Sequence, residues 1–308
     1  MIRHLLLLSA AAVAWSLDTT TIPADHRWAL QFDLERIMAG RVGRWIDRLA
    51  ERPDLRPKLA LFTTVTGSDP RKDLRLVTFS GRDARPESGV LAITGSLDRE
   101  KLTTLVESAD GHHATVYREH QVHDWKDSGK TPQAEQFGVI CGTQLVVVAN
   151  ARDRLLAVLD VVDRVVPGLE PGRMPVVKDR QNAPGKETVL ASGLATGLND
   201  WQGLTPEAAI LRHITSAALV LCERDGKLVM RFRVEASALR TAKQLASVVE
   251  GFISLSQLDP KARTDPAWLA VIESATVELE GKTLFLSAEL PIDLAEEHWS
   301  ERIGKPAP

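Results

Sequence analysis

The chain has 308 residues, of which 44% are hydrophobic and 26% are charged, and its formal net charge is −3. This balance is typical of a globular protein that buries a full core, and it excludes a disordered coat. Acidic and basic residues are interspersed along the chain instead of forming blocks. Because nucleic acids require a basic face, we expect no nucleic-acid partner.

Residues 1–16 have the pattern of an export signal peptide. Arg3 and His4 form a short basic start, an apolar run follows over Leu5–Ala14, and Ala12-Val13-Ala14 matches the small-x-small pattern of a cleavage site. The run is shorter than the roughly 20 residues that a membrane-spanning helix needs. We therefore expect a periplasmic or secreted protein with no transmembrane segment after signal removal. The alternative is a buried N-terminal helix of the mature fold.

Residues 17–166 predict a first half that mixes helices and antiparallel strands. Trp28, Leu30 and Phe32 alternate as in a strand, and Asp33 is a suitable N-cap for the helix that follows. Gly40 lies inside this predicted helix. Because glycine is unfavourable in a helix, packing against the rest of the protein must hold the helix together. The elements expected in chain order are a strand at 28–32, a helix at 33–49, strands at 74–80 and 89–94, a helix from about 96, strands at 114–117, 121–125, 137–141 and 144–149, and a helix at 151–165.

Residues 167–186 are rich in proline and glycine, which stop both helix and sheet, and we expect a linker there. Residues 187–308 then predict a second half. Thr205-Pro206-Glu207 is a strong helix start, and Asp225-Gly226 is a strong hairpin turn. The elements expected are a strand at 188–195, a helix from 205, strands at 217–223 and 227–234, a helix at 237–255, a short helix from 265, strands at 276–280 and 283–289, and a helix at 292–299.

Both halves thus follow the order strand, helix, hairpin, helix, hairpin, helix. We expect an α+β protein of two similar halves, each an antiparallel sheet covered by helices, as an internal duplication would produce.

The histidines around residue 120 are the sharpest candidates for chemistry. His120 and His123, with Glu119 and Asp124 beside them, offer imidazole and carboxylate ligands that suit zinc or copper. On a regular strand His120 and His123 point to opposite faces, whereas a tight turn at His120 would let them converge. The alternative is a solvated hairpin tip.

Other reactive patterns are absent from the sequence. Cys141 and Cys222 lie in separate apolar runs without a C-x-x-C motif or neighbouring histidines, and we expect two separate buried thiols. The chain contains no Gly-x-Ser-x-Gly and no phosphate-binding loop. The sequence therefore identifies no catalytic residue and no cofactor.

Several structural features resemble those of uncharacterised secreted bacterial proteins with a domain of unknown function. They are the export signal, the strand 28–33 that runs into a helix, the Ser96-Leu97-Asp98 junction, and the Gly142-Thr143 turn before Leu145-Val146-Val147-Val148. This resemblance implies no activity and no catalytic residue. We expect a non-enzymatic protein of the cell envelope or exterior that binds a partner protein or a small ligand. The alternatives are a hydrolase or metal-dependent enzyme with a site between the halves, to which residues 112–124 contribute, and a structural interaction module with an exposed apolar patch.

Overall fold

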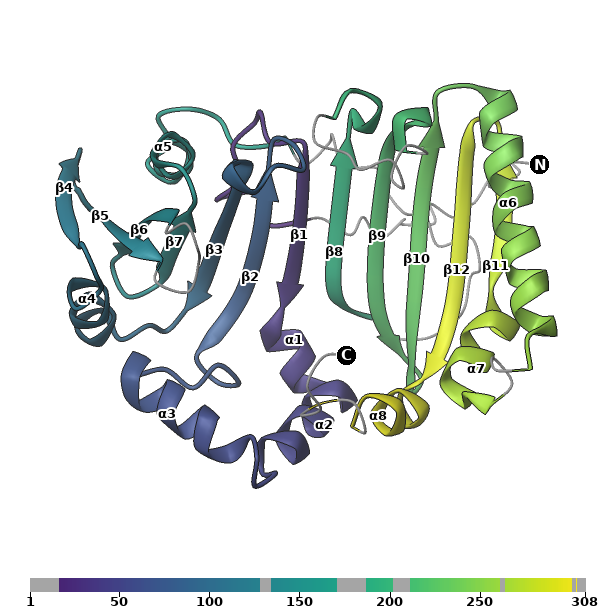
Figure 1. The fold of residues 1–308 in the computed structure, drawn as a ribbon, viewed down its shortest axis with the longest axis horizontal. Helices are drawn as coiled ribbons and strands as arrows, with labels where there is room; N and C mark the ends of the chain where they lie inside the picture. Colours follow the sequence, from purple (N-terminus) through teal and green to yellow (C-terminus); the bar gives the residue numbers. More distant parts are fainter. Residues whose placement is uncertain are drawn as a thin grey trace, which may run out of the picture.

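The computed structural model describes residues 17–127, 134–170, 187–201, 211–260, 264–300 and 303. The predicted export signal, most of the predicted linker and the predicted helix start at Thr205 lie outside these ranges. Twelve strands of the described chain form one antiparallel sheet (Figure 1). The strands are β1 Trp28–Asp33, β2 Leu74–Gly81, β3 Gly89–Gly95, β4 His113–Tyr117, β5 His120–Asp127, β6 Ala134–Cys141, β7 Leu145–Ala149, β8 Thr188–Thr196, β9 Ile214–Arg224, β10 Lys227–Ala236, β11 Thr276–Glu280 and β12 Thr283–Pro291.

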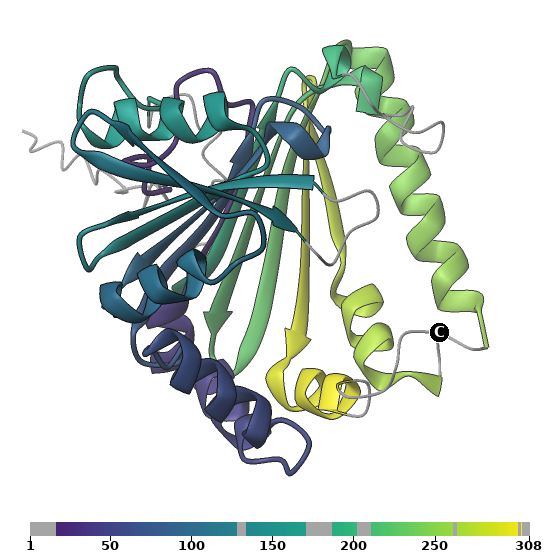
Figure 2. The ribbon, with the colours of Figure 1, turned by 60° about the vertical axis from the view of Figure 1, so that its left-hand side comes forward.

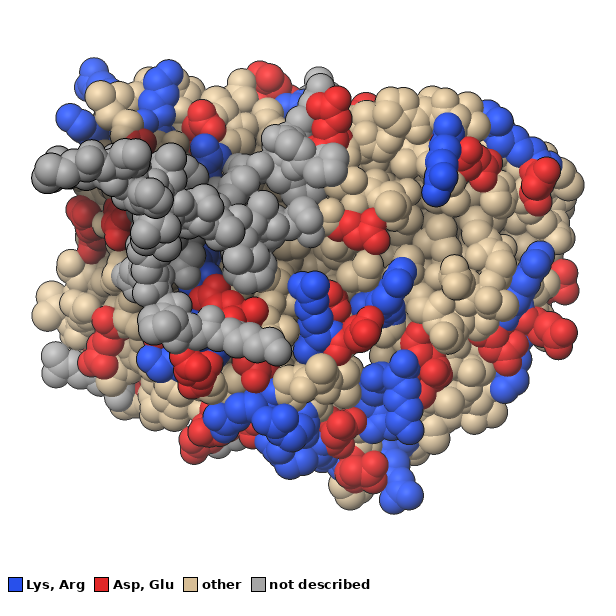
Figure 3. All heavy atoms as spheres, turned by 180° about the vertical axis from the view of Figure 1, so that it is seen from behind, with Lys and Arg blue, Asp and Glu red and all other residues tan. Residues whose placement is uncertain are grey.

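The helices cover both faces and one end of this sheet. They are α1 Leu34–Ala39, α2 Arg41–Ala50, α3 Arg56–Thr66, α4 Arg99–Glu107, α5 Arg152–Val162, α6 Leu239–Leu258, α7 Pro266–Ser274 and α8 Ile292–Ser300. None of the described helices is long and apolar enough to cross a membrane. Lysine and arginine side chains are intermixed with acidic ones on the face shown in Figure 3.

The strand order is β11-β12-β10-β9-β8-β1-β2-β3-β7-β6-β5-β4. The strands of the two halves meet where β1 pairs antiparallel with β8, with Leu30 opposite Gly193. Outward from this junction, the first half runs β1-β2-β3-β7-β6 and the second runs β8-β9-β10-β12-β11. The hairpin β4–β5 extends the first half only.

Helices α4 and α5 lie on opposite faces of the outer part of the first half. Side chains alternate along a strand, so Val147 of β7 packs in the core under α5 while Val146 faces α4. Figure 2 shows the outer strands between the two helices. This arrangement places two separate groups of side chains on the two faces.

The predicted strands and hairpins are confirmed. Asp225 and Gly226 have φ values of 48° and 78°, as the turn between β9 and β10 requires. The side chains of Asp33 and Asp98 accept hydrogen bonds from backbone N–H groups at the starts of α1 and α4.

The prediction of one helix over 33–49 is wrong, because the chain breaks at Gly40 into α1 and α2. The carboxylate of Glu223, from β9, accepts hydrogen bonds from the backbone N–H of Arg41 at 2.9 and 3.0 Å, and so caps α2. A Cβ on residue 40 would collide with this carboxylate. Helix α3 was not predicted at all.

One core cluster joins the halves. Ile37 of α1 packs with Leu190 of β8, Leu228 of β10 and Ile292 of α8. The first residues of the predicted linker also pack on the fold, since Leu169 is buried and Gly168 forms a β-bridge with Pro23.

Candidate functional site

The candidate site is a cavity between α4 and the sheet. The carboxylate of Asp98 caps α4 by accepting a hydrogen bond from the backbone N–H of Lys101 at 3.1 Å. Leu102, Leu105 and Val106 follow at helical spacing and line the cavity. No residue of α4 is fully buried, so the helix does not close tightly onto the strands beneath it.

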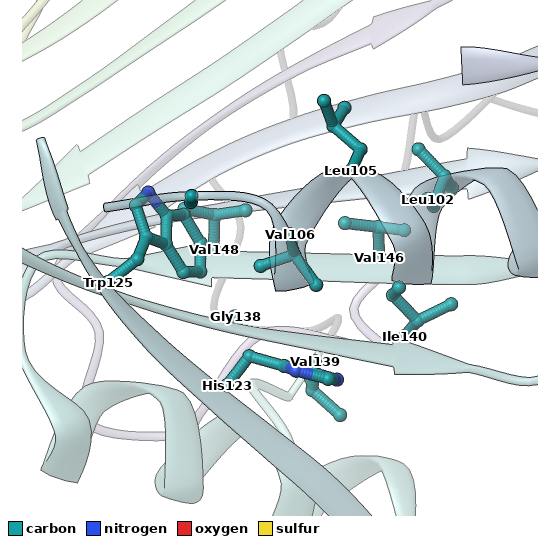
Figure 4. A pocket seen from close by; sticks show the side chains of 11 residues that line it. Leu102, Leu105, Val106, His123, Trp125, Gly138, Val139, Ile140, Val146 and Val148 are labelled. Atoms are coloured by element: carbon teal, nitrogen blue, oxygen red, sulfur yellow. The ribbon is translucent and has the colours of Figure 1, made fainter. Parts of the chain in front are cut away.

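The floor of the cavity comes from β5, β6 and β7. A Cβ on Gly138 would lie 2.9 Å from two carbons of the Trp125 ring, so glycine at this position makes room for the indole. Figure 4 shows Trp125 at one end of the cavity, with aliphatic side chains along the rest. The lining residues are Leu102, Leu105, Val106, Ala109, His123, Trp125, Gly138, Val139, Ile140, Val146 and Val148.

The cavity has a volume of about 360 Å³, which lies within the range of small-molecule sites. Its described lining is aliphatic or aromatic apart from His123. An apolar surface of this kind favours an apolar ligand, because water at the wall finds few hydrogen-bond partners.

His123 lies at the edge of the cavity and is stacked on His112, with ring centroids 5.3 Å apart. Its Nδ1 lies 3.0 Å from Nε2 of His112, so one ring nitrogen donates the hydrogen and the other accepts it. Burial, followed by the charge of His112, lowers the pKa of His123 below its ordinary value, whereas Glu107 and Asp124 oppose the shift. A neutral His123 therefore completes a nearly uncharged wall.

A second group lies on the α5 face of the same strands. Nδ1 of His120 lies 3.6 Å from Sγ of Cys141, and Nε2 of His120 lies 2.8 Å from Oδ1 of Asp163. Burial raises the pKa of the Cys141 thiol to about 11; the charge of Asp163 adds to the shift and Arg99 opposes it. This group therefore contains a protonated thiol beside an imidazole.

The structure does not bring the two predicted metal ligands together. His120 and His123 lie on opposite faces of β5, because His120 pairs with Tyr117 and begins a regular strand instead of sitting in a turn. Their partners also differ. His120 contacts Cys141 and Asp163, whereas His123 contacts His112. In the part of the chain that the structure describes, no group of three or more His, Cys, Asp or Glu side chains is arranged to hold a metal ion.

Sequence reasoning missed the partners of His120. It found no histidine near either cysteine along the chain, but Val122 pairs with Val139, so the same register places His120 opposite Cys141. The sequence could have revealed this contact only through the register of the two strands, which requires knowing that residues 120–127 pair with residues 134–141. Cys141 and Cys222 are separate thiols that form no disulfide, as expected; Cys222 is buried and Cys141 is partly exposed.

Comparison with known proteins gives a fold and no family. No protein-family model matches the chain. No curated protein matches its sequence either. Among solved structures, crystal form III of TP0453 is similar with a TM-score of 0.50 and 11% identity, over 93% of this chain and 99% of that one. Crystal form IV of TP0453 gives a TM-score of 0.47 at 11% identity, over 95% and 100% of the two chains. The chain therefore has a mixed α+β fold similar to that of TP0453 over nearly its whole length.

Proposed function

We propose that this protein is a binding protein that takes a small apolar ligand into the cavity beneath α4. The observation that carries this proposal is a cavity of about 360 Å³ whose described walls are hydrocarbon, apart from one buried histidine and the indole nitrogen of Trp125. Each apolar group that enters such a space leaves water, and burial contributes about 25 cal/mol per Å² of apolar surface.

The chemistry of the walls favours binding over catalysis. Among the described lining side chains, only His123 and Trp125 carry nitrogen atoms. Nδ1 of His123 already forms a hydrogen bond with His112. Neither a nucleophile nor a carboxylate is among the described lining residues. A hydrocarbon chain or an aromatic ring system satisfies this surface, whereas a charged group would lose its hydration there without a compensating partner.

The experiment that tests the proposal is titration with N-phenyl-1-naphthylamine, an uncharged aromatic probe whose fluorescence rises in apolar surroundings. Leu105 lines the cavity and is 42% exposed, so Leu105→Asp places a charge at the cavity without removing a buried side chain. We expect the Kd of the probe to rise about tenfold or more, because the charge must be desolvated on binding.

Leu61→Asp is the matched control. Leu61 is 65% exposed on α3 and does not line the cavity. We expect the Kd to stay within about twofold of the wild-type value. Equal weakening by both substitutions, or no probe binding by the wild-type protein, would contradict the proposal.

We also propose that the protein works outside the cytosol, in the periplasm or beyond the cell, and is related to uncharacterised secreted bacterial proteins. The N-terminal pattern of residues 1–16 supports this location. N-terminal sequencing of the protein from its native cells tests it, with a start shortly after Ala14 as the expected result and an intact Met1 as the contrary one.

An internal duplication is the origin we propose for the two halves. Its support is the strand order, which is the same outward from the β1–β8 junction for five strands on each side. Under this proposal, the hairpin β4–β5 is an addition to the first half. That addition supplies His123 and Trp125 to the cavity.

A second candidate function, that of an interaction module, is favoured by one face of α6. Four apolar side chains there, Val248, Phe252, Leu255 and Leu258, are 58–71% exposed. Sedimentation equilibrium of the wild-type protein and of Phe252→Gln/Leu255→Gln tests this candidate. Self-association that the double substitution abolishes would favour it over the ligand-binding proposal, and a monomer in both cases would rule out self-association through α6.

A further inference from the structure

Three side chains on the α5 face of the sheet form a continuous hydrogen-bonded series. Sγ of Cys141 lies 3.6 Å from Nδ1 of His120, and Nε2 of the same ring lies 2.8 Å from Oδ1 of Asp163. The residues come from the end of β6, the start of β5 and the C-cap of α5. They are separated from the α4 cavity by the sheet itself.

The proton positions follow from this series. A carboxylate only accepts hydrogen bonds, so Nε2 of His120 carries the hydrogen that Asp163 receives. The lone pair of Nδ1 then faces the thiol, whose S–H donates to it. The geometry is therefore that of a base-assisted nucleophile: Cys141 is the nucleophile, His120 is the base, and Asp163 orients the base.

Regular elements hold the three groups in place. His120 is fixed on the outer side by pairing with Tyr117, and the β5–β6 ladder holds the same strand from Val122 onward. Asp160 connects the end of α5 to the end of β4. Its carboxylate accepts a hydrogen bond from the Tyr117 hydroxyl at 2.9 Å and forms an ion pair with Arg118 at 3.1 Å. The His120 and Asp163 side chains remain 17% and 25% exposed, so small molecules can reach them.

We propose that Cys141 is a nucleophile that accepts an acyl group from an activated ester, with His120 as its general base and Asp163 as a positioning residue. Sγ transfers its proton to Nδ1 of His120 and attacks the carbonyl carbon, forming the S–C bond. The ester C–O bond breaks, and His120 returns the proton to the departing oxygen. The products are a thioester on Cys141 and a free alcohol.

The Cys141 thiol is protonated at rest, so its reaction needs a general base. With a thiol pKa of about 11, roughly one thiol in ten thousand is ionised at pH 7, so a preformed thiolate contributes little. The reaction at neutral pH therefore depends on transfer of the proton to His120 during attack. The second thiol is not comparable, since Cys222 is 0% exposed and its sulfur lies 3.9 Å from the Arg231 guanidinium.

The experiment measures acetylation of Cys141 by p-nitrophenyl acetate, using release of p-nitrophenolate and peptide mass spectrometry in the Cys222→Ser background. General-base assistance contributes about 10²–10⁴-fold, so His120→Ala should slow acetylation at pH 7 by at least about 100-fold. Asp163→Asn should give a smaller loss. His113→Ala is the matched control: this neighbouring histidine is exposed and pairs with Asp124, and we expect its removal to leave the rate unchanged.

The dependence of the acetylation rate on pH distinguishes a general-base role of His120 from a merely structural one. The wild-type rate should be appreciable at pH 7 and should not rise tenfold per pH unit above it, because the thiol proton moves to Nδ1 of His120 during attack. The His120→Ala rate should instead rise about tenfold per pH unit towards pH 11, following the thiolate. Acetylation at residues other than Cys141, or a wild-type profile that follows the thiolate alone, would overturn the proposal. The wild-type profile decides the matter even where a variant does not fold.

Discussion

His26 is a buried histidine on which the acid stability of the fold depends. It is 3% exposed, its Nδ1 lies 3.0 Å from Oγ of Ser80, and its Nε2 has no hydrogen-bond partner among the described residues. Burial is the main cause that lowers its pKa from 6.5 to about 4; Asp25 opposes the shift, and Arg82 contributes to it. The folded protein therefore prefers a neutral ring, whereas the unfolded chain takes up a proton near pH 6.5.

The sign of the pH dependence follows from this difference. The contribution of His26 is complete above about pH 6.5 and is lost as the pH falls towards 4, because the unfolded state binds the proton first. We expect the loss to be about 3 kcal/mol, since one pKa unit corresponds to about 1.4 kcal/mol. Urea unfolding at several values between pH 7 and pH 4 measures it.

His26→Asn keeps a polar atom near Oγ of Ser80 and removes the titrating ring. We expect this variant to be less stable at pH 7 and to lose much less stability between pH 6.5 and pH 4 than the wild-type protein. His113→Asn, at an exposed position, should keep the full wild-type dependence. An unchanged slope in His26→Asn would show that other groups cause the acid loss.

At the scale of elements, the break between α1 and α2 gives the sharpest prediction. Helix propensity alone predicts that Gly40→Ala stabilises the protein by up to about 1 kcal/mol. The structure predicts the opposite, because the added Cβ displaces the Glu223 carboxylate that caps Arg41. Loss of a cap costs about 0.5–2 kcal/mol. Thermal unfolding should therefore show a lower Tm for Gly40→Ala.

Glu223→Ala is the companion variant and removes the same cap directly. We expect it to be destabilised, and Gly40→Ala should add little to it, because both changes remove one interaction. Glu119→Ala, at an exposed turn, should change the free energy of unfolding by less than about 0.5 kcal/mol. Additive losses in the double variant would contradict the account of this helix break.

The elements also show what sequence reasoning could reach. Alternation and turn residues located strands such as β9 and β10, because those patterns are local. Gly40 was recognised as costly, but the cap that breaks the helix comes from Glu223, far along the chain. Likewise, the sequence predicts a helix from about 96, while the cavity beneath α4 and the contact of His120 with Cys141 depend on strand pairing that no local pattern specifies.

At the scale of the whole molecule, the two halves share one sheet and one core cluster. β1 pairs with β8, and Ile37 packs against Leu190 and Ile292 of the second half. We expect the described halves to unfold together, because neither keeps its inner sheet edge covered without the other. Hydrogen exchange with peptide-level mass spectrometry in urea should show one transition for peptides of both halves.

Gly193→Val tests this coupling at the junction itself. A Cβ there would lie 3.2 Å from Cδ1 of Leu30 across the β1–β8 pair, so the larger side chain overpacks the junction and must displace the Leu30 side chain. Its destabilisation, about 1–3 kcal/mol, should lower the protection of peptides in both halves equally. Protection lost in one half alone would show two independent domains.

We expect the cavity beneath α4 to hold an apolar molecule. The most direct measurement is a crystal structure of the protein soaked with 1-bromonaphthalene, in which the anomalous signal of bromine locates the ligand. We predict a bromine peak between α4 and strands β5–β7, within contact distance of Trp125 and Val106. A cavity filled by its own side chains, or bromine bound only elsewhere, would contradict the claim.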